Sequence, residues 1–340
     1  MFPGLIDDIR RAGGAAGRAY LVSRGFTDRQ LAEAVQARAV VRARRGWYSI
    51  WPEGDLRLRA LRLGGRLTGL SAIQAWAGWV LSPGRMHVAV PANAARLRCP
   101  QSRRVQFTQS LQRESVTLHW MRERHDRDTS SGIVSLAEAL EVVCLTEPAE
   151  QAIAAIDWAR RSGRIDAIGL EALILSLPRA RHGLVHRSSG SCHSLPESLA
   201  RTRLTSAGLQ VREQVGLPDN LSPIDLVIEN AIALDIDGDE FHRNRFLFDR
   251  TKDLAATRAG FHAVRPAARH VFSEWDSTFE AIRVALTARG VPLVAPHIRS
   301  APASGVNNSG LPHRRRRATR ANPRTSSPRP RKRPPIVLSC

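Results

Sequence analysis

Three aspartates on two neighbouring apolar segments are the side chains of this 340-residue sequence best suited to chemistry. Asp225 lies in the segment 224–228, and Asp235 and Asp237 lie in the segment 232–237. Both segments alternate with a period of two, which is typical of strands, so Asp235 and Asp237 would point to one face. A three-residue turn joins the segments and would bring Asp225 opposite Asp235.

Facing carboxylates predict a bound cation. Directly paired residues on adjacent strands have Cβ atoms about 4.5–5.5 Å apart, where like charges destabilise a hairpin unless a cation lies between them. Carboxylate oxygens are the ligands that Mg²⁺ and Mn²⁺ prefer. We therefore expect a Mg²⁺ (or Mn²⁺) site at Asp225 and Asp235, of the kind that assists phosphodiester hydrolysis. The alternative is that Asp225, Asp235 and Asp237 form the exposed polar face of an ordinary hairpin.

The elements around these aspartates are predicted to form one module, residues 194–290. Ser194 and Glu197 open a helix that ends near Gly208, since Ser is a good N-cap and Gly a good C′ residue. The elements expected after it are strands at 209–215, 224–228 and 232–237, a helix at about 247–259, a strand at 261–265 and a helix at 276–289. This order, α-β-β-β-α-β-α, is the core order of restriction-endonuclease-like folds.

A set of residues spread over the same module carries a resemblance to a known family. They are Ser194, Glu197, Arg201, Gly208, Leu209, Gln214, Val215, Asp225, Asp235, Asp237, Gly238, His242, Asp249, Arg250, Lys252, Asp253, Gly260 and Phe261. With them the module resembles a small domain of unknown function related to very-short-patch-repair (Vsr) endonucleases, within the PD-(D/E)xK nuclease superfamily. The resemblance implies a Mg²⁺-dependent endonuclease domain.

The resemblance also implies the roles of the residues on the predicted hairpin. Asp225 and Asp235 become the metal-binding acids, and Ile236 offers its backbone carbonyl to the same ion. Asp237 falls where the superfamily places its lysine, as in this branch, and is counted with the catalytic residues. Two departures remain. The branch usually has glutamate where this chain has the shorter Asp235, and a classical catalytic lysine is absent.

Further catalytic residues are implied outside the hairpin. Glu197 would add a carboxylate, although Ser194-x-x-Glu197 is also a capping box. His242 would be the general base or a phosphate contact, because histidine titrates near neutrality, and the alternative is a surface residue. Asp249 and Lys252 lie three apart on one helix, where Lys252 would stabilise the charge on the reacting phosphate. The alternative for both is ion pairing on the helix surface.

The first 55 residues predict a winged helix. Thr27 and Gln30 form a capping-box pattern at the start of its second helix. The elements expected are helices at 17–23 and 27–37 and strands at 39–41 and 47–51, joined by a basic connection at 42–46. The DNA contacts expected are Arg29 and Gln30 on the second helix, at base edges, and Arg42, Arg44 and Arg45 on the wing, at phosphates. The alternative is a protein–protein module whose arginines are solvated.

A second resemblance covers this winged helix and the mixed α and β module predicted at 56–180. The pattern Arg24–Thr27, Leu31 and Arg44–Tyr48 resembles the N-terminal domain of AbiEi-type antitoxins of abortive-infection systems, and Asp157-Trp158-Ala159 before Arg164 resembles their middle region. In this middle module we expect a helix at 70–78, strands at 86–91 and 115–121 and two helices within 133–159. A linker is expected at 181–193.

The middle module offers no convincing catalytic cluster. His87 and His119 are isolated strand histidines, expected to be packed or on the surface, and Asp157 is expected in a cap or an ion pair. Cys99, Cys144, Cys192 and Cys340 lack Cys-x-x-Cys spacing, which argues against a zinc site and a disulfide framework.

The net charge of +20 makes DNA the expected macromolecular partner. About half of this charge lies in the Arg- and Pro-rich segment 291–340, which has no acid and few large apolar residues and is expected to be disordered. No apolar run approaches the roughly 18 residues of a membrane span, and the N-terminus lacks the pattern of a signal peptide. We therefore expect a cytoplasmic protein without a membrane partner.

Two functions follow from these features. The first is a DNA-binding protein with a Mg²⁺-dependent endonuclease domain that acts in DNA repair or phage defence. The second is a non-cutting transcriptional regulator or antitoxin of a type IV toxin–antitoxin system, whose partner is a toxin protein. Asp235 and the missing classical lysine favour the second function, and the otherwise complete set of acids with His242 favours the first.

Deleting residues 314–333 is expected to weaken sequence-independent DNA binding, because the Arg-rich segment neutralises phosphates and releases their counterions. Binding of one duplex measured at several salt concentrations tests this. The slope of log affinity against log salt should fall by about 0.9 for each phosphate that the shortened protein no longer neutralises. An unchanged slope would contradict the prediction.

Overall fold

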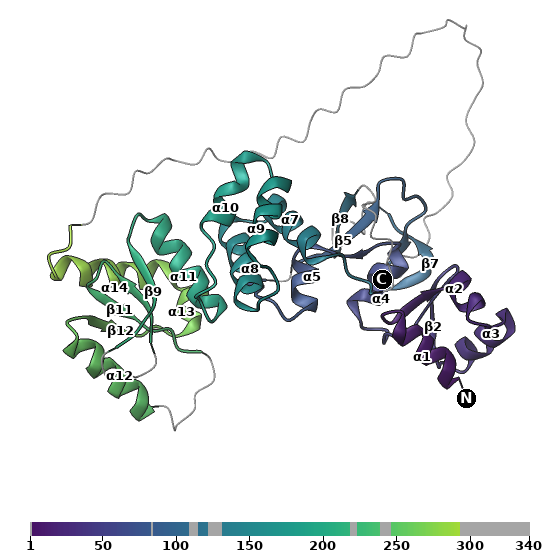
Figure 1. Ribbon diagram of the computed structural model, residues 1–340, viewed down its shortest axis with the longest axis horizontal. Coiled ribbons are helices and arrows are strands. Elements are labelled where there is room, and N and C mark those ends of the chain that lie inside the picture. Colours follow the sequence, from purple (N-terminus) through teal and green to yellow (C-terminus); the bar gives the residue numbers. More distant parts are fainter. Residues whose placement is uncertain are drawn as a thin grey trace, which may run out of the picture. The chain divides into compact units, whose positions relative to one another are not determined.

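The computed structural model describes residues 2–82, 84–108, 115–121, 131–217, 223–238 and 246–292. All of these residues belong to one compact unit, 1–294, of mixed α and β structure (Figure 1). The predicted tail lies outside the described residues from 293 onward. No helix in the described ranges is long and apolar enough to cross a membrane.

The N-terminal segment is a three-stranded antiparallel sheet, order β1-β3-β2, with helices packed on it. Its elements are α1 (Pro3–Arg11), β1 (Ala15–Gly17), α2 (Arg18–Ser23), α3 (Asp28–Gln36), β2 (Val41–Arg44) and β3 (Trp47–Ser49). Leu5, Leu21 and Leu31 lie fully buried between them. The predicted capping box is confirmed: Gln30 N–H donates to Thr27 Oγ1, and Thr27 N–H donates to Gln30 Oε1 at 2.9 Å.

Strand β2 lies further along the chain than the sequence predicts. The predicted basic connection 42–46 is mostly strand, and only Arg45 and Gly46 remain in the turn. Ala43 is the reason: it is fully buried against Trp51 and Leu58, and this contact holds the preceding and following residues in the sheet.

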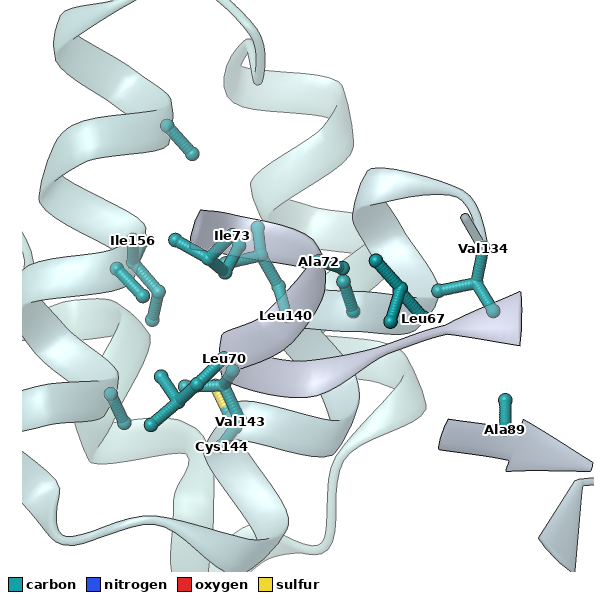
Figure 2. Close-up of a cluster of buried hydrophobic side chains, with 14 of the residues drawn as sticks. Leu67, Leu70, Ala72, Ile73, Ala89, Val134, Leu140, Val143, Cys144 and Ile156 are labelled. Atoms are coloured by element: carbon teal, nitrogen blue, oxygen red, sulfur yellow. The ribbon is translucent and has the colours of Figure 1, made fainter. Parts of the chain in front are cut away.

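The middle segment combines a small sheet with a group of helices. Its elements are α4 (Leu56–Leu63), β4 (Arg66–Leu67), α5 (Gly69–Ala75), β5 (Met86–Pro91), β6 (Arg98–Cys99), β7 (Ser102–Gln106), β8 (Val116–Met121), α7 (Leu136–Thr146), α8 (Ala149–Arg161) and α9 (Ala167–Ser176). The sheet order is β4-β5-β8, with β5 and β8 parallel, and β6 and β7 form a separate hairpin. Figure 2 shows Leu70, Ile73, Leu140 and Ile156 meeting in its buried core.

The segment 181–193, expected to be a linker, contains ordered structure. A short 3₁₀ helix, η1 (Arg179–Arg181), leads into α10 (His182–His186), and Leu184 and Val185 are buried in the middle core. Cys192 is also buried. The weak apolar pattern failed to predict this helix because its stability comes from packing on α8 and α9 rather than from an amphipathic face of its own.

The C-terminal segment is a four-stranded mixed sheet with helices on both faces. Its elements are α11 (Leu195–Ser206), β9 (Val211–Val215), β10 (Ile224–Ile228), β11 (Ile232–Leu234), α12 (Phe246–Arg258), β12 (His262–Val264), α13 (Ala268–Ser273) and α14 (Trp275–Ala288). The strand order is β12-β11-β10-β9, antiparallel except for the β11–β12 pair. Leu226 and Leu234 pack against α11, α13 and α14, and Val227 and Ala233 pack against α12 (Figure 1).

This element order matches the predicted α-β-β-β-α-β-α order with one addition, α13. Strand β11 is shorter than predicted and ends at Leu234. Beyond it the chain stays beside the β12 side of the sheet, where Asp235 N–H donates to Val264 O and Asp237 N–H donates to Pro266 O.

A buried ion pair joins the middle and C-terminal segments. Arg201 on α11 donates to Asp157 Oδ2 on α8 at 2.8 Å, and the Asp157 side chain is fully buried. The same carboxylate accepts hydrogen bonds from Ser198 Oγ and from Ser189 N–H, both at 2.6 Å. The expectation of an ion pair or cap for Asp157 is confirmed.

Replacing Arg201 with alanine should destabilise the protein by about 3–5 kcal/mol, because it leaves the Asp157 carboxylate buried without its cation. Urea unfolding followed by tryptophan fluorescence and circular dichroism measures the change. Arg10→Ala is the matched control, since Arg10 pairs with Asp7 on the exposed face of α1 and should contribute at most about 1 kcal/mol. Equal effects of the two substitutions would refute the prediction.

Candidate active site

The hairpin of β10 and β11 places Asp225 and Asp235 side by side. Its register pairs Leu226 with Leu234, so the next residues outward are the two aspartates. The backbone N–H of Asp225 donates to Asp235 Oδ1 at 3.2 Å, and the N–H of Ile236 donates to Asp225 Oδ2 at 2.8 Å. The sequence predicted this juxtaposition from the three-residue turn.

Burial separates Asp235 from an ordinary surface aspartate. Asp235 is 5% exposed, so the alternative of an exposed polar hairpin face is wrong for this residue. The Asp237 side chain, two residues on, is 45% exposed and lies at the rim. The buried acids are therefore Asp235 and the partly buried Asp225, and their charges need compensation from the surrounding protein or from a ligand.

The negative charge of Asp225 is less well balanced by neighbouring positive charges than that of Asp235. Burial raises its pKa to about 7, and the nearby negative charges of Glu197 and Asp235 act in the same direction. The hydrogen bond from Ile236 and the charge of Lys252 oppose this rise without cancelling it. Asp225 is thus a site where an additional positive charge would be favourable.

Lys252 on α12 supplies a positive charge directly to the hairpin. Its Nζ lies 2.6 Å from Asp235 Oδ1 and 2.7 Å from the carbonyl oxygen of Pro223, and the residue is 6% exposed. The alternative of an ion pair on the helix surface is therefore wrong for Lys252. Helix α12 therefore brings a lysine to the carboxylate of Asp235 from outside the hairpin.

Arg265, at the end of β12, is a residue of this site that sequence reasoning missed. Its guanidinium lies 2.7 Å from Asp253, 2.9 Å from Asp237 and 3.4 Å from Asp235, with Asp249 at 3.6 Å. Burial lowers the pKa of Arg265, and the carboxylates of Asp253, Asp237 and Asp235 outweigh it and raise the pKa above the ordinary arginine value. No local pattern indicates this contact, because it depends on the parallel pairing of β12 with β11, which brings the residue after β12 beside the residues after β11.

Glu197 serves as a helix cap and also lies near the aspartates. Its Oε1 accepts from Ser194 Oγ at 2.7 Å, and its Oε2 accepts from His193 N–H at 2.8 Å and from Gln214 Nε2 at 3.1 Å. The capping interpretation therefore holds, with His193 as the backbone donor. Its electrostatic effect on Asp225 places its charge close to the same site.

Two predicted catalytic residues remain, Asp249 and His242. Asp249 lies at the rim beside Arg265, and neighbouring Arg250 and Asp253 form an ion pair along α12 at 3.3 Å. His242 lies outside the described residues.

The hairpin carboxylates are the candidate ligands for the magnesium ion that the sequence predicts. Within the described ranges, no three His, Cys, Asp or Glu side chains form a group that could hold a metal by themselves. Glu197 has both oxygens engaged by Ser194, His193 and Gln214, and Asp235 has its oxygens engaged by Lys252, the N–H of Asp225 and Arg265, so an ion at the pair Asp225 and Asp235 would share Asp235 with these groups. Magnesium commonly uses one or two carboxylates and completes its shell with water and substrate phosphate oxygens, so this pair fits it.

The predicted DNA-contacting residues differ in availability. Arg42 and Arg45 are exposed, and Arg29 is exposed but pairs with Glu33 at 2.8 Å. The Gln30 side chain is held in the capping box. Arg44 packs against the end of α4, where burial lowers its pKa and a side chain at Gly64 would collide with its guanidinium. Gln30 and Arg44 are thus less free than the sequence suggested.

The two strand histidines pack against each other. His119 Nε2 lies 3.3 Å from His87 Nδ1, their rings are stacked, and burial lowers the pKa of His119 to about 4. The expectation that they are packed residues is confirmed. The described cysteines, Cys99, Cys144 and Cys192, are free and buried.

Comparison with known proteins adds no assignment to this geometry. No protein-family model matches the chain, and no curated protein matches it significantly. The function proposed below is therefore argued from the residues and their arrangement.

Asp225→Asn should make the protein more stable at pH 8 and flatten its pH dependence. The folded protein holds a proton on Asp225 up to about pH 7, whereas an unfolded aspartate releases it near pH 4. Wild-type stability should therefore fall as the pH rises from about 4 to 7, by about 4 kcal/mol, and stay level above. Asp7→Asn, at an exposed ion pair, is the control. Urea unfolding between pH 5 and 8 without divalent cations measures this, and parallel curves for wild type and Asp225→Asn would contradict it.

Proposed function

We propose that the protein is a DNA-binding, Mg²⁺-dependent endonuclease whose active centre is the end of the β10–β11 hairpin. The observation that carries the proposal is the partly buried pair Asp225 and Asp235, with Lys252 Nζ 2.6 Å from Asp235. Two acids and a lysine that meet at one end of the two central strands of a mixed sheet are groups that can carry out phosphodiester hydrolysis with a bound metal ion. The surrounding α-β-β-β-α-β order supports a restriction-endonuclease-like domain.

Each residue has a distinct task in this proposal. Asp225 and Asp235 hold the ion, and the backbone N–H of Ile236 fixes the orientation of Asp225. Lys252 brings a positive charge to the side where the reacting phosphate gains negative charge. Arg265 binds Asp235, Asp237 and Asp253 and so holds the end of β12 and the start of α12 around the centre. His242 retains its proposed role as proton acceptor.

The ion would supply two effects when bound. It would polarise a phosphate oxygen and make a nearby water more acidic. Because the protein provides two carboxylates, the scissile phosphate itself would complete the site. Binding of the ion should therefore be stronger in the presence of DNA than in its absence.

A winged helix at the N-terminus would deliver DNA to this centre. The antiparallel sheet β1-β3-β2, whose β2–β3 hairpin follows α3, and the exposed Arg42 and Arg45 support this part of the proposal. In it, Arg29 exchanges its ion pair with Glu33 for a contact to DNA, and Arg42 and Arg45 bind phosphates.

One observation favours a second function, a DNA-binding regulator or antitoxin that no longer cuts. Lys252 and Arg265 already neutralise Asp235, so the hairpin is stable without a metal. A nuclease domain that has lost its activity would also have a hairpin that is stable without a metal. In this alternative the same fold binds DNA, or a toxin protein, and the aspartates contribute only to its structure.

A cleavage assay in Mg²⁺ or Mn²⁺ on supercoiled plasmid, mismatched duplex and single-stranded DNA tests the proposal. Wild type should cut at least one substrate, and Asp225→Asn and Asp235→Asn should lose about 10³-fold in rate, which corresponds to roughly 4 kcal/mol of transition-state stabilisation. Asp276→Asn, an exposed acid on α14, is the matched control and should cut like wild type. DNA affinity should stay within a few-fold in all variants.

Two outcomes would overturn the endonuclease. Cutting by Asp225→Asn at the wild-type rate would remove the proposed centre. Absence of cutting by wild type on every substrate, with DNA binding intact, would favour the regulator or antitoxin instead.

A further inference from the structure

A cleft of about 820 Å³ lies between the N-terminal sheet and the β6–β7 hairpin of the middle segment. Five arginines line it: Arg38, Arg42, Arg62, Arg103 and Arg104. Glu53 is the one acid in its lining among the described residues. A cleft lined by one sign of charge focuses its field and attracts ligands of the opposite sign, so this cleft suits an anion.

Arg62 differs from the other arginines of the cleft because it is buried. The residue is 7% exposed, held by Glu53 at 2.5 Å and by the carbonyl oxygen of Gln101 at 3.4 Å. Its Nε is buried and has no hydrogen-bond acceptor among the described residues. A buried donor without an acceptor is unfavourable, so the positive charge of Arg62 at the cleft is only partly satisfied by the protein.

The remaining arginines stand on both walls of the cleft. Arg38 and Arg42 come from the end of α3 and from β2, and Arg103 and Arg104 come from β7. All four are exposed, and no ion pair engages them within the described ranges. Their guanidinium groups are therefore available to a ligand that touches both walls.

Phosphate esters are the anions that best match these groups. The planar guanidinium donates two parallel hydrogen bonds to phosphate oxygens, which a cleft lined by arginine exploits more fully than one lined by lysine. The five arginines and one glutamate give the cleft a positive charge larger than that needed to neutralise a single phosphate group. A strand that carries one phosphate per nucleotide can meet the arginines of both walls in succession.

We propose that this cleft binds the sugar-phosphate backbone of a nucleic-acid strand. The site is separate from the hairpin carboxylates and joins the N-terminal segment to the β6–β7 hairpin as one binding surface. The proposed function supplies the choice of nucleic acid as the ligand, so this inference rests on that function. Sequence preference is not expected, because guanidinium contacts to phosphates carry none.

The test uses full-length protein without divalent cations, so that cleavage plays no part. Binding of a fluorescein-labelled oligothymidylate is measured by anisotropy over a range of salt for wild type, for Arg103→Ala/Arg104→Ala and for Arg161→Ala/Arg179→Ala. Arg161 and Arg179 are exposed arginines outside the cleft, so the last variant removes the same charge elsewhere. Circular dichroism and the unfolding midpoint check that each variant folds.

The cleft variant should bind about tenfold or more weakly, and its salt slope should fall by about 1.4, at roughly 0.7 for each single-strand phosphate that it no longer neutralises. The control variant should stay within threefold of wild type. Equal weakening in the two variants would overturn the proposal, because general charge would then explain the binding.

Hydrogen–deuterium exchange locates the bound strand and distinguishes it from a free nucleotide as the ligand. Oligothymidylate should protect residues 101–106 and 38–42 in wild type. Thymidine monophosphate at the same phosphate concentration should protect them much less, and equal protection would replace the strand with a free nucleotide as the ligand. The cleavage assay reports separately on the hairpin centre: weaker binding by the cleft variant supports this inference whether or not wild type cuts DNA.

Discussion

The opposed carboxylates of the β10–β11 hairpin are the constraint that organises the C-terminal segment. A register that buries Leu226 and Leu234 on one face brings Asp225 and Asp235 together on the other. Two acids there would repel each other, and the fold answers with Lys252 from α12 and Arg265 from β12. Because Asp225 is left with a pKa of about 7, the compensation is incomplete.

The hairpin differs from the structural ion pair of Asp157 and Arg201 in its exposure. The Asp157 carboxylate accepts three hydrogen bonds, joins two helices and is fully buried, and burial raises its pKa as it raises that of Asp225. Asp225 is only partly buried. At the hairpin, by contrast, Asp235 is neutralised and Asp225 is not. A divalent cation at Asp225 would complete the balance in the endonuclease that we propose.

The arginines divide in a similar way, according to their surroundings. Arg201 and Arg265 are consumed by carboxylates, and Arg44 lies against the end of α4. In the cleft, Arg62 is buried with a donor unsatisfied and its neighbours on both walls are exposed. The abundance of arginine in the composition does not distinguish these cases. The difference lies in exposure and ion pairing, since Arg38, Arg42, Arg103 and Arg104 are exposed and make no ion pair within the described ranges.

The sequence by itself determined the local features of this protein. The capping box at Thr27, the helix start at Ser194 and the facing of Asp225 and Asp235 depend on residues a few positions apart, so their patterns are readable. Only the tertiary structure decided the partners of the aspartates. Lys252 and Arg265 reach them because α12 packs on the sheet and β12 pairs with β11, which no local pattern encodes. The extension of β2 through Ala43, the helix α10 and the arginine cleft were hidden for the same reason, since burial against distant residues creates them.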